Sequence, residues 1–222
     1  MVDRVTRKRG RNIALIDQFL KRIGFSAAIG DNGRIAEMPE ESVDVLIAYH
    51  SDYGNTKKMA DAIAAGLMVA NPAVLVKLQT AENTSLDDLL AADVIVFGTP
   101  VHMGSMAWQM KQLIDRAGKL WMEGGLEGKV GGVFASGGGF GGAGGGVETT
   151  MISLHSHFLE QGLITVGFPK SLPGYADGGL QWGPYGRSGN HEGMPGSISE
   201  GALAAARSYG AHLAEMAGKL ID

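Results

Sequence analysis

Short apolar segments alternate with amphipathic helical segments through most of this chain, and this alternation restricts the fold more than any other feature. Five segments have the pattern of buried strands: Val43–Tyr49, Val74–Leu78, Asp93–Gly98, Val130–Ala135 and Leu163–Phe168. Helices are expected at Lys57–Val69, Leu86–Ala91, Met106–Gly118, Glu148–Gln161 and Ser199–Leu220. Strands separated by helices favour a parallel sheet covered on both faces. We therefore predict an α/β fold, a five-stranded parallel sheet with helices on both faces.

In such sheets, ligands bind beyond the carboxyl ends of the strands. The turn after the first strand consists of Ser51, Asp52, Tyr53, Gly54, Asn55 and Thr56. Its N–H groups and those of the next helix would point at one place, where the helix dipole adds partial positive charge. The turn contains no Lys or Arg, which suits a monophosphate better than a triphosphate. The alternative is an ordinary turn with Asn55 or Thr56 as the helix N-cap.

Two further strand ends carry unusual loops. One contains Gly98, Thr99, Pro100, Val101, His102, Met103 and Gly104. Its glycines let the backbone approach a flat ligand closely, and its N–H groups would bond the polar edge of a ring. The other is a Gly-rich loop over residues 136–146. A flexible linker is the alternative there, but a position between a buried strand and a helix favours a loop that wraps a ligand.

Composition limits the class of protein. A chain of 222 residues with 45% hydrophobic residues is expected to form one main domain with a sizeable core. The net charge of −4 gives no sign of nucleic-acid binding. The absence of Cys excludes disulfides, thiolate metal sites and Cys nucleophiles. No apolar run is long enough for a membrane span, so we expect a cytoplasmic protein. The histidines show no metal-binding spacing, and no metal site is predicted.

The first part of the chain differs from the rest. Residues 1–40 contain eight Lys and Arg against five Asp and Glu. We divide the chain into an N-terminal extension over residues 1–42, a basic arm with a possible short helix through Ile13, Ile16, Leu20 and Ile23, and a main domain over residues 43–222. A targeting peptide is the alternative for the arm, but a clean apolar core and cleavage motif are missing.

Taken together, these motifs resemble the flavodoxin-like FMN proteins, and more narrowly the WrbA family of NAD(P)H:quinone oxidoreductases. The resemblance covers the chain from about Val43 to its C-terminal end. It rests on SDYGNT at 51–56, GTPVHMGSMAWQM at 98–110, DRAGKLWMEGGLEGK at 115–129, the Gly-rich loop leading to Val147, GPYG at 183–186, and ARSYG at 206–210. Each piece alone is a weak or moderate signal, whereas all of them in this order form a strong one.

The resemblance implies a flavodoxin-like fold that holds FMN noncovalently. Carried over by position, the phosphate turn is Ser51, Asp52, Tyr53, Gly54, Asn55 and Thr56, and the loop beside the flavin ring is Thr99, Pro100, Val101, His102, Met103 and Gly104. The loop at the pyrimidine edge of the ring is Ser136, Gly137, Gly138, Gly139, Gly141 and Gly142. The implied reaction is two-electron reduction of quinones by NADH or NADPH, with hydride passing through flavin N5 and ping-pong kinetics.

Three residues are implied in catalysis. Tyr53 occupies the position that contacts the nicotinamide in the family, and Trp121 the position that contacts the quinone. His102 is the one titratable side chain of the flavin loop and is a candidate proton donor. The family usually has Arg and Phe where this chain has His102 and Met103. A solvated His102 and a Trp108 that only packs against its helix are the plain alternatives.

Two other functional classes stay open. A flavodoxin-type carrier would pass single electrons between proteins, and a non-enzymatic FMN-binding or interaction protein would use the same fold to recruit a partner. The long segment Pro169–Ile198, rich in Gly, Pro and Ser, is predicted to be a loop along an oligomer interface. The resemblance implies a homodimer or homotetramer with sites at its interfaces. The sequence does not distinguish NADH from NADPH or identify the electron acceptor.

Overall fold

The computed structural model describes residues 42–139, 144–189 and 196–220. The predicted arm therefore lies outside the described residues except for its last position, and so does the helix expected through Ile13 and Leu20. Gly141 and Gly142 of the predicted flavin site lie outside them as well.

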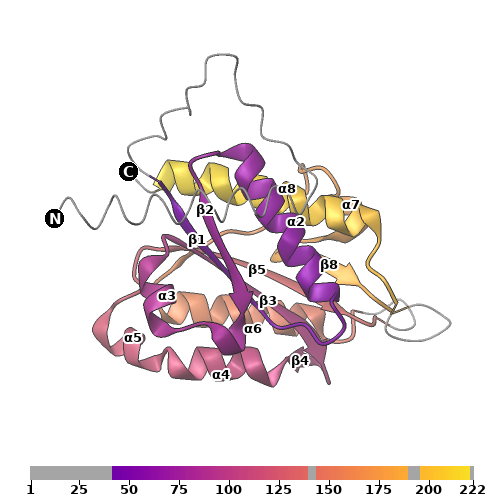
Figure 1. Ribbon diagram of the computed structural model, residues 1–222. Coiled ribbons are helices and arrows are strands. Elements are labelled where there is room, and N and C mark those ends of the chain that lie inside the picture. Colours follow the sequence, from indigo (N-terminus) through magenta and orange to yellow (C-terminus); the bar gives the residue numbers. More distant parts are fainter. Residues whose placement is uncertain (1–41, 140–143, 190–195, 221–222) are drawn as a thin grey trace, which may run out of the picture. The chain divides into compact units, whose positions relative to one another are not determined.

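Four parallel strands form the centre of the sheet, as the apolar segments predict (Figure 1). They are β1 Asp44–Tyr49, β2 Leu75–Thr80, β3 Val94–His102 and β5 Val130–Gly137. The strand order is β2-β1-β3-β5-β8-β7, so the order reverses between β1 and β3. This reversal is the position at which ligands bind in open α/β sheets.

The fifth position of the sheet is divided between two segments. β6 Ile164–Thr165 pairs with the start of β5, and β8 Gly183–Arg187 pairs in parallel with its end. The prediction of a continuous strand over Leu163–Phe168 is wrong, because the chain leaves the sheet after Thr165 and returns at Gly183. The intervening residues form α7 Tyr175–Gly178 and β7 Gly179–Leu180. The predicted loop Pro169–Ile198 thus contains part of the sheet.

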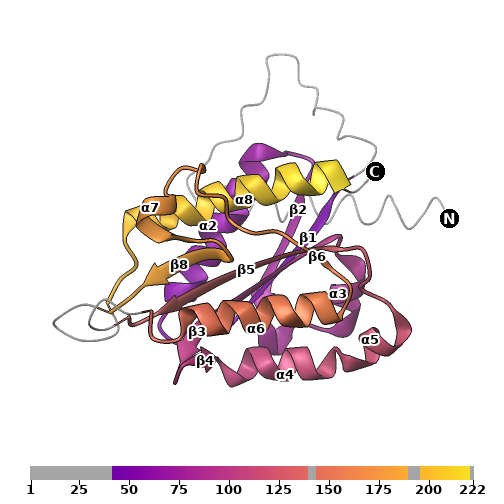
Figure 2. The same cartoon turned by 180° about the vertical axis from the view of Figure 1, so that it is seen from behind.

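Helices cover both faces, which confirms the predicted fold class (Figures 1 and 2). α2 Asn55–Ala70 and α8 Glu200–Leu220 lie on one face with α7. The other face is covered by α3 Leu86–Ala91, α4 Trp108–Arg116, α5 Gly118–Glu123 and α6 Val147–Glu160. The short elements η1 Ala81–Asn83 and β4 Ser105–Met106 complete the described structure. None of the described helices is long and apolar enough to span a membrane.

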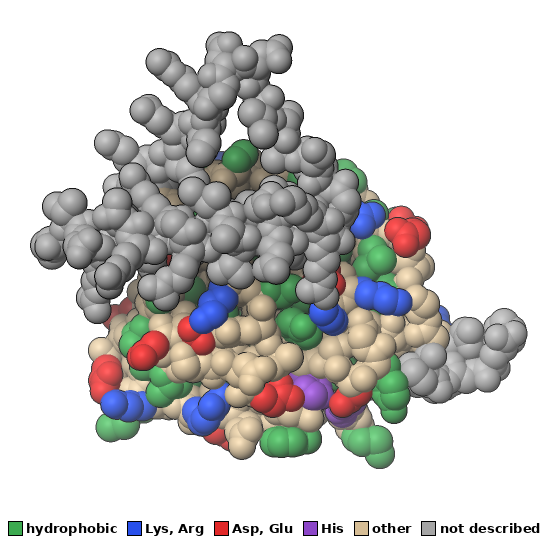
Figure 3. Space-filling view, viewed as in Figure 1, with side chains coloured by type: hydrophobic (Ala, Val, Ile, Leu, Met, Phe, Trp, Pro, Cys, Tyr) green, Lys and Arg blue, Asp and Glu red, His purple; other side chains and the backbone are tan. Residues whose placement is uncertain are grey.

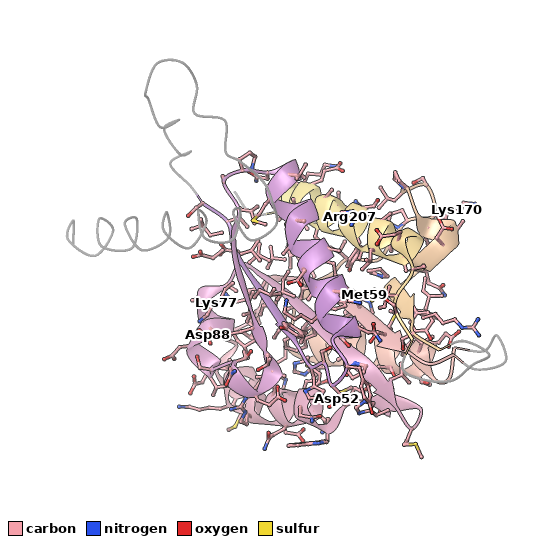
Figure 4. All side chains as sticks on the ribbon, turned by 45° about the vertical axis from the view of Figure 1, so that its right-hand side comes forward. Asp52, Met59, Lys77, Asp88, Lys170 and Arg207 are labelled. Carbon is pink, nitrogen blue, oxygen red and sulfur yellow. The ribbon has the colours of Figure 1, made fainter. Side chains whose placement is uncertain are left out.

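The edge near β2 is held by charged side chains. Lys77 of β2 forms an ion pair with Asp88 of α3 (Figure 4). Burial acts in the opposite direction, but hydrogen bonds from Lys77, Ser85 and Gln79 hold the pKa of the Asp88 carboxyl below its usual value. The Ser85 and Asp88 side chains also form a capping box at the start of α3.

Two glycines allow α2 and α8 to pack with their backbones in close approach. A Cβ added to Gly210 of α8 would lie 2.1 Å from the carbonyl oxygen of Ile63. A Cβ on Gly66 of α2 would lie 1.9 Å from the carbonyl oxygen of Arg207, a residue of α8 labelled in Figure 4. The helix pair on this face therefore depends on the absence of side chains at both positions.

We predict that Gly210→Ala lowers the free energy of unfolding by about 2 to 3 kcal/mol, since overpacking forces the helices apart. Gly218→Ala in the same helix is the matched control, because no atom of residues 42–139, 144–189 or 196–220 lies within 4 Å of its Cβ position. Better helix propensity should make that variant equal to the parent or up to about 1 kcal/mol more stable. Urea unfolding measures both values, and equal effects of the two substitutions would contradict this packing.

His157 of α6 is partly buried against the ring of Phe97, with centroids 5.9 Å apart. Burial, together with the nearby Lys111 cation, lowers the pKa of His157 to about 4, and Asp115 opposes this shift. The unfolded chain therefore binds a proton near pH 6.5, whereas the folded chain does not until about pH 4. The stability associated with the neutral ring is complete above pH 6.5 and is lost as the pH falls towards 4.

His157→Gln should remove this contribution, which amounts to roughly 2 kcal/mol after allowance for the partial exposure of the ring. The free energy of unfolding in urea, measured at pH 7.5 and 4.5 for both proteins, gives the pH-dependent loss for each. We expect a smaller loss for the variant. If parent and variant lose the same amount, His157 is not the responsible group.

Candidate functional site at the strand tips

The register of the central strands brings three loops to one edge of the sheet. Tyr49 of β1 pairs with Gly98 of β3, which pairs in turn with Phe134 of β5. The tips that follow these residues are the β1–α2 turn, the β3–β4 turn and the Gly-rich loop after β5. Gly98 is required in this row, because a Cβ there would lie 1.9 Å from the Phe134 ring.

The β1–α2 turn ends at Gly54, which is the N-cap of α2 with a left-handed φ of 81°. Neither Asn55 nor Thr56 is the cap, contrary to the alternative derived from sequence, since both already belong to the helix. The Asn55 side chain donates instead to the carbonyl oxygen of Gly196 at 2.9 Å. Ser51 Oγ accepts a hydrogen bond from the N–H of Lys57 at 3.3 Å. The first helical N–H groups have no carbonyl partner within α2.

A buried hydrogen bond joins the first and third loops. Thr56 Oγ1 and Ser136 Oγ lie 2.7 Å apart, and both side chains are almost completely buried. Gly137, which follows Ser136, accepts hydrogen bonds at its carbonyl oxygen from Tyr185 Oη and from the N–H of Ser188. β8 thus fixes the start of the Gly-rich loop from the other side.

The second loop is a tight hairpin between β3 and β4. His102 pairs with Ser105, and the two residues between them are both left-handed, with φ 48° at Met103 and 82° at Gly104. Met103 is the one described non-glycine residue with positive φ, and its side chain is fully exposed. Such strained exposed positions cluster at functional sites. Thr99, predicted as a ligand, is buried, and its hydroxyl accepts from the N–H of Ala107.

The second and third loops touch through glycine. A Cβ on Gly146, the N-cap of α6, would lie 2.5 Å from the Cα of Gly104. By contrast, no atom of the described residues lies within 4 Å of the Cβ positions of Gly54 and Gly104 themselves, so the described backbone leaves both loop tips open to an approaching ligand. The three predicted loops therefore lie together, and Gly138 and Gly139 continue the third loop from Gly137.

A chain of histidines and carboxylates lies along the first two loops. His50 Nε2 lies 3.1 Å from Asp52 Oδ1, and His50 Nδ1 lies 2.8 Å from Glu82 Oε1. Asp52 Oδ2 lies 3.1 Å from His102 Nε2. Asp52 is labelled at the start of α2 in Figure 4, and Figure 3 shows histidine side chains beside acidic ones on this face. Sequence reasoning missed His50 and Glu82; the position of His50 directly before the turn was the only signal.

The aromatic residues singled out from the sequence lie at different distances along the fold from the three strand-tip loops. Tyr53 lies in the first loop and is 70% exposed. Trp121 lies in α5, and α5 leads back to the start of β5, at the opposite ends of the strands. The chain therefore does not bring Trp121 to its own loops. Trp108 begins α4 directly after the β3–β4 hairpin and is 64% exposed, so it is not a packing residue in this chain.

A separate groove lies away from the strand tips. It has a volume of about 580 Å³ and runs along β6 and α8, with lining residues that include Val166, Phe168 and Met216. Its lining is mostly apolar and offers none of the clustered polar groups of the strand tips. Among the described residues, no group of His, Cys, Asp and Glu is arranged to hold a metal ion.

Comparisons with known proteins agree with this arrangement. The flavodoxin family model matches residues 47–179. A curated protein of Geobacter metallireducens named NAD(P)H dehydrogenase (quinone) is 38% identical over 205 residues, covering 79% of this chain and 98% of that protein. A protein of the same name from Syntrophobacter fumaroxidans is 37% identical over 203 residues, covering 79% and 98%.

Solved structures show the same fold. The crystal structure of a flavodoxin, WrbA-like protein from Agrobacterium tumefaciens matches with a TM-score of 0.61 and 31% identity, covering 81% of this chain and 99% of that one. A flavodoxin from the domain Archaea matches with a TM-score of 0.55 and 22% identity, covering 79% and 99%. The second likeness concerns the fold alone.

Proposed function

The chain belongs to the flavodoxin family, in which its curated relatives are NAD(P)H dehydrogenases (quinone), and we propose that it reduces quinones with NAD(P)H on a bound FMN. The observation that carries this proposal is the convergence of three loops at the reversal of strand order. When bound, FMN would accept a hydride from the nicotinamide and pass two electrons to the acceptor.

The loops fit the two ends of FMN. The phosphate would lie at the start of α2, where N–H groups of Asn55 and Thr56 and the helix dipole favour an anion. The flavin ring would lie against the open backbone at Gly104 and the described start of the Gly-rich loop, Ser136–Gly139. N–H groups of that loop would stabilise negative charge at the ring edge. The Thr56–Ser136 hydrogen bond would hold these two subsites at a fixed separation.

Exposed side chains at the tips would shape the substrate face. Tyr53 offers a flat surface for stacking beside the nicotinamide or quinone. His102, 40% exposed, would donate a proton to the reduced acceptor. Fully exposed Met103 would border the same face. These roles explain why large apolar side chains remain uncovered next to the loops.

The proposal is tested by titrating the purified protein with FMN and then mixing the complex anaerobically with NADH or NADPH. We expect one FMN per chain, rapid bleaching of the flavin absorbance by at least one nicotinamide, and reoxidation by benzoquinone. Thr56→Val should weaken FMN binding about tenfold, because it removes the hydroxyl that meets Ser136. Thr165→Val, in β6 at the far end of the sheet, is the matched control and should bind FMN normally.

Two results would contradict the proposal. If no FMN binds, the protein is not a flavoprotein and the interaction alternative gains support. If FMN binds but neither nicotinamide bleaches it, the one-electron carrier becomes the better account.

We extend the proposal to a homodimer or homotetramer in which α5 of one copy faces the strand tips of another. Trp121 lies at the end of the sheet opposite its own strand tips, so it would not contact a ligand bound there. Its side chain is nevertheless 52% exposed, and that of the neighbouring Met122 is 79% exposed. Uncovered aromatic and Met side chains are typical of subunit interfaces.

Sedimentation equilibrium at micromolar concentration should therefore give a mass of two or four chains. Trp121→Ala should lower the quinone reaction rate while leaving FMN binding unchanged, since the side chain contacts substrate rather than cofactor. If the protein is a strict monomer and still reduces quinone, Trp121 does not belong to the substrate site.

A further inference from the structure

We propose that Glu82, His50 and Asp52 form a positioning chain that keeps a proton available to His102 for transfer to the bound acceptor. This inference rests on the proposed function and assigns roles to three residues beyond it. The four side chains come from separate elements: Glu82 from η1, His50 and Asp52 from the end of β1 and the turn after it, and His102 from the end of β3.

The hydrogen-bond geometry at His50 calls for an additional proton in the chain. Both ring nitrogens of His50 lie at hydrogen-bond distance from carboxylate oxygens, 2.8 Å to Glu82 and 3.1 Å to Asp52. A neutral imidazole has one donor and one acceptor, whereas an ionised carboxylate only accepts. If the ring is neutral and both carboxylates are ionised, only one of the two contacts can be a hydrogen bond. Both contacts are hydrogen bonds only if the three groups together hold one additional proton.

The surroundings of His50 separate its ring from bulk water. Its side chain is only 9% exposed, whereas those of Glu82 and Asp52 are 39% and 41% exposed. The ring is thus enclosed while the carboxylates that face it remain in contact with solvent. Arg116 of α4 donates to the carbonyl oxygens of Ala81 and Thr84, which fixes the backbone on both sides of Glu82. Lys57 of α2 is occupied by an ion pair with Asp61.

Asp52 is the link between His50 and His102. One carboxylate oxygen faces His50 and the other faces His102, both at 3.1 Å. The two imidazole rings stand edge to face, with centroids 6.4 Å apart. Asp52 would otherwise place a negative charge inside the turn proposed to bind a phosphate, where like charges repel. The additional proton held with His50 would compensate that charge within the protein.

The reaction needs the proton that this arrangement supplies. Reduction of a quinone to a hydroquinone takes two electrons and two protons, and the hydride of NAD(P)H supplies two electrons and one proton. The second proton would come from His102, as its N–H bond breaks and an O–H bond forms on the acceptor. His102 Nε2 faces Asp52, and within the described residues Nδ1 has no hydrogen-bond partner, so Nδ1 is the atom we assign as donor. The chain then restores the proton on His102 through Asp52, and its exposed carboxylates take a proton from water.

The test combines spectroscopy with a division of the reaction into halves. Ring ¹⁵N NMR of the FMN complex at pH 7 should show protons on both nitrogens of His50. In stopped-flow experiments, Glu82→Gln should slow reoxidation by benzoquinone roughly tenfold and leave bleaching by NAD(P)H unchanged, because only reoxidation consumes the proton. His102→Gln should slow reoxidation more than Glu82→Gln does. Asp87→Asn, an exposed carboxylate of α3, is the matched control and should change neither half.

Each outcome decides a stated part of the inference. A single N–H on His50 at pH 7, with both facing carboxylates ionised by ¹³C NMR, would overturn the proton accounting. Equal slowing of both half-reactions in Glu82→Gln would reduce that residue to a structural role. Slower reoxidation of Glu82→Gln that disappears at low pH, where solvent supplies the proton directly, would support the assignment. A wild-type protein that binds FMN but does not reduce quinone would refute the proposed function itself, and the His50 spectrum would still report the state of the chain.

Discussion

The parallel pairing of β1, β3 and β5 is the constraint on which the rest of this structure depends. It places Tyr49, Gly98 and Phe134 in one row, so that the loops following them start from the same edge of the sheet. Gly98 makes the row possible, because the Phe134 ring occupies the space of its missing side chain. Without this register, the Thr56–Ser136 hydrogen bond and the Gly104–Gly146 contact would not form.

Local patterns were sufficient to predict the four central strands and the longer helices, but not α5 or α7. The helix over Leu86–Ala91 was predicted to the residue, and α2, α6 and α8 to within two residues at each end. The division of the fifth position between β6 and β8 was missed, because it depends on long-range pairing with β5. β8 begins with Gly183 and Pro184, which look like a turn, and its pairing is set by Ala135–Gly137 of a distant strand.

The predicted site residues fall into different physical classes. Ser51, Thr56 and Ser136 hold loops together, while Tyr53, His102 and Met103 are exposed at the tips. Sequence position suggested the exposed group but did not reveal that Thr99 is buried or that Met103 is left-handed. His50 and Glu82 could not be paired from sequence, because 32 residues separate them and only the fold brings them together.

The central claim, one FMN held by three strand tips, is tested most directly by mapping backbone amide resonances during an FMN titration. We predict that the largest shifts fall together in residues 51–56, 99–104 and 136–139, with one common affinity for all three groups. Shifts concentrated along the groove of Val166 and Phe168, or different affinities for the three loops, would contradict it.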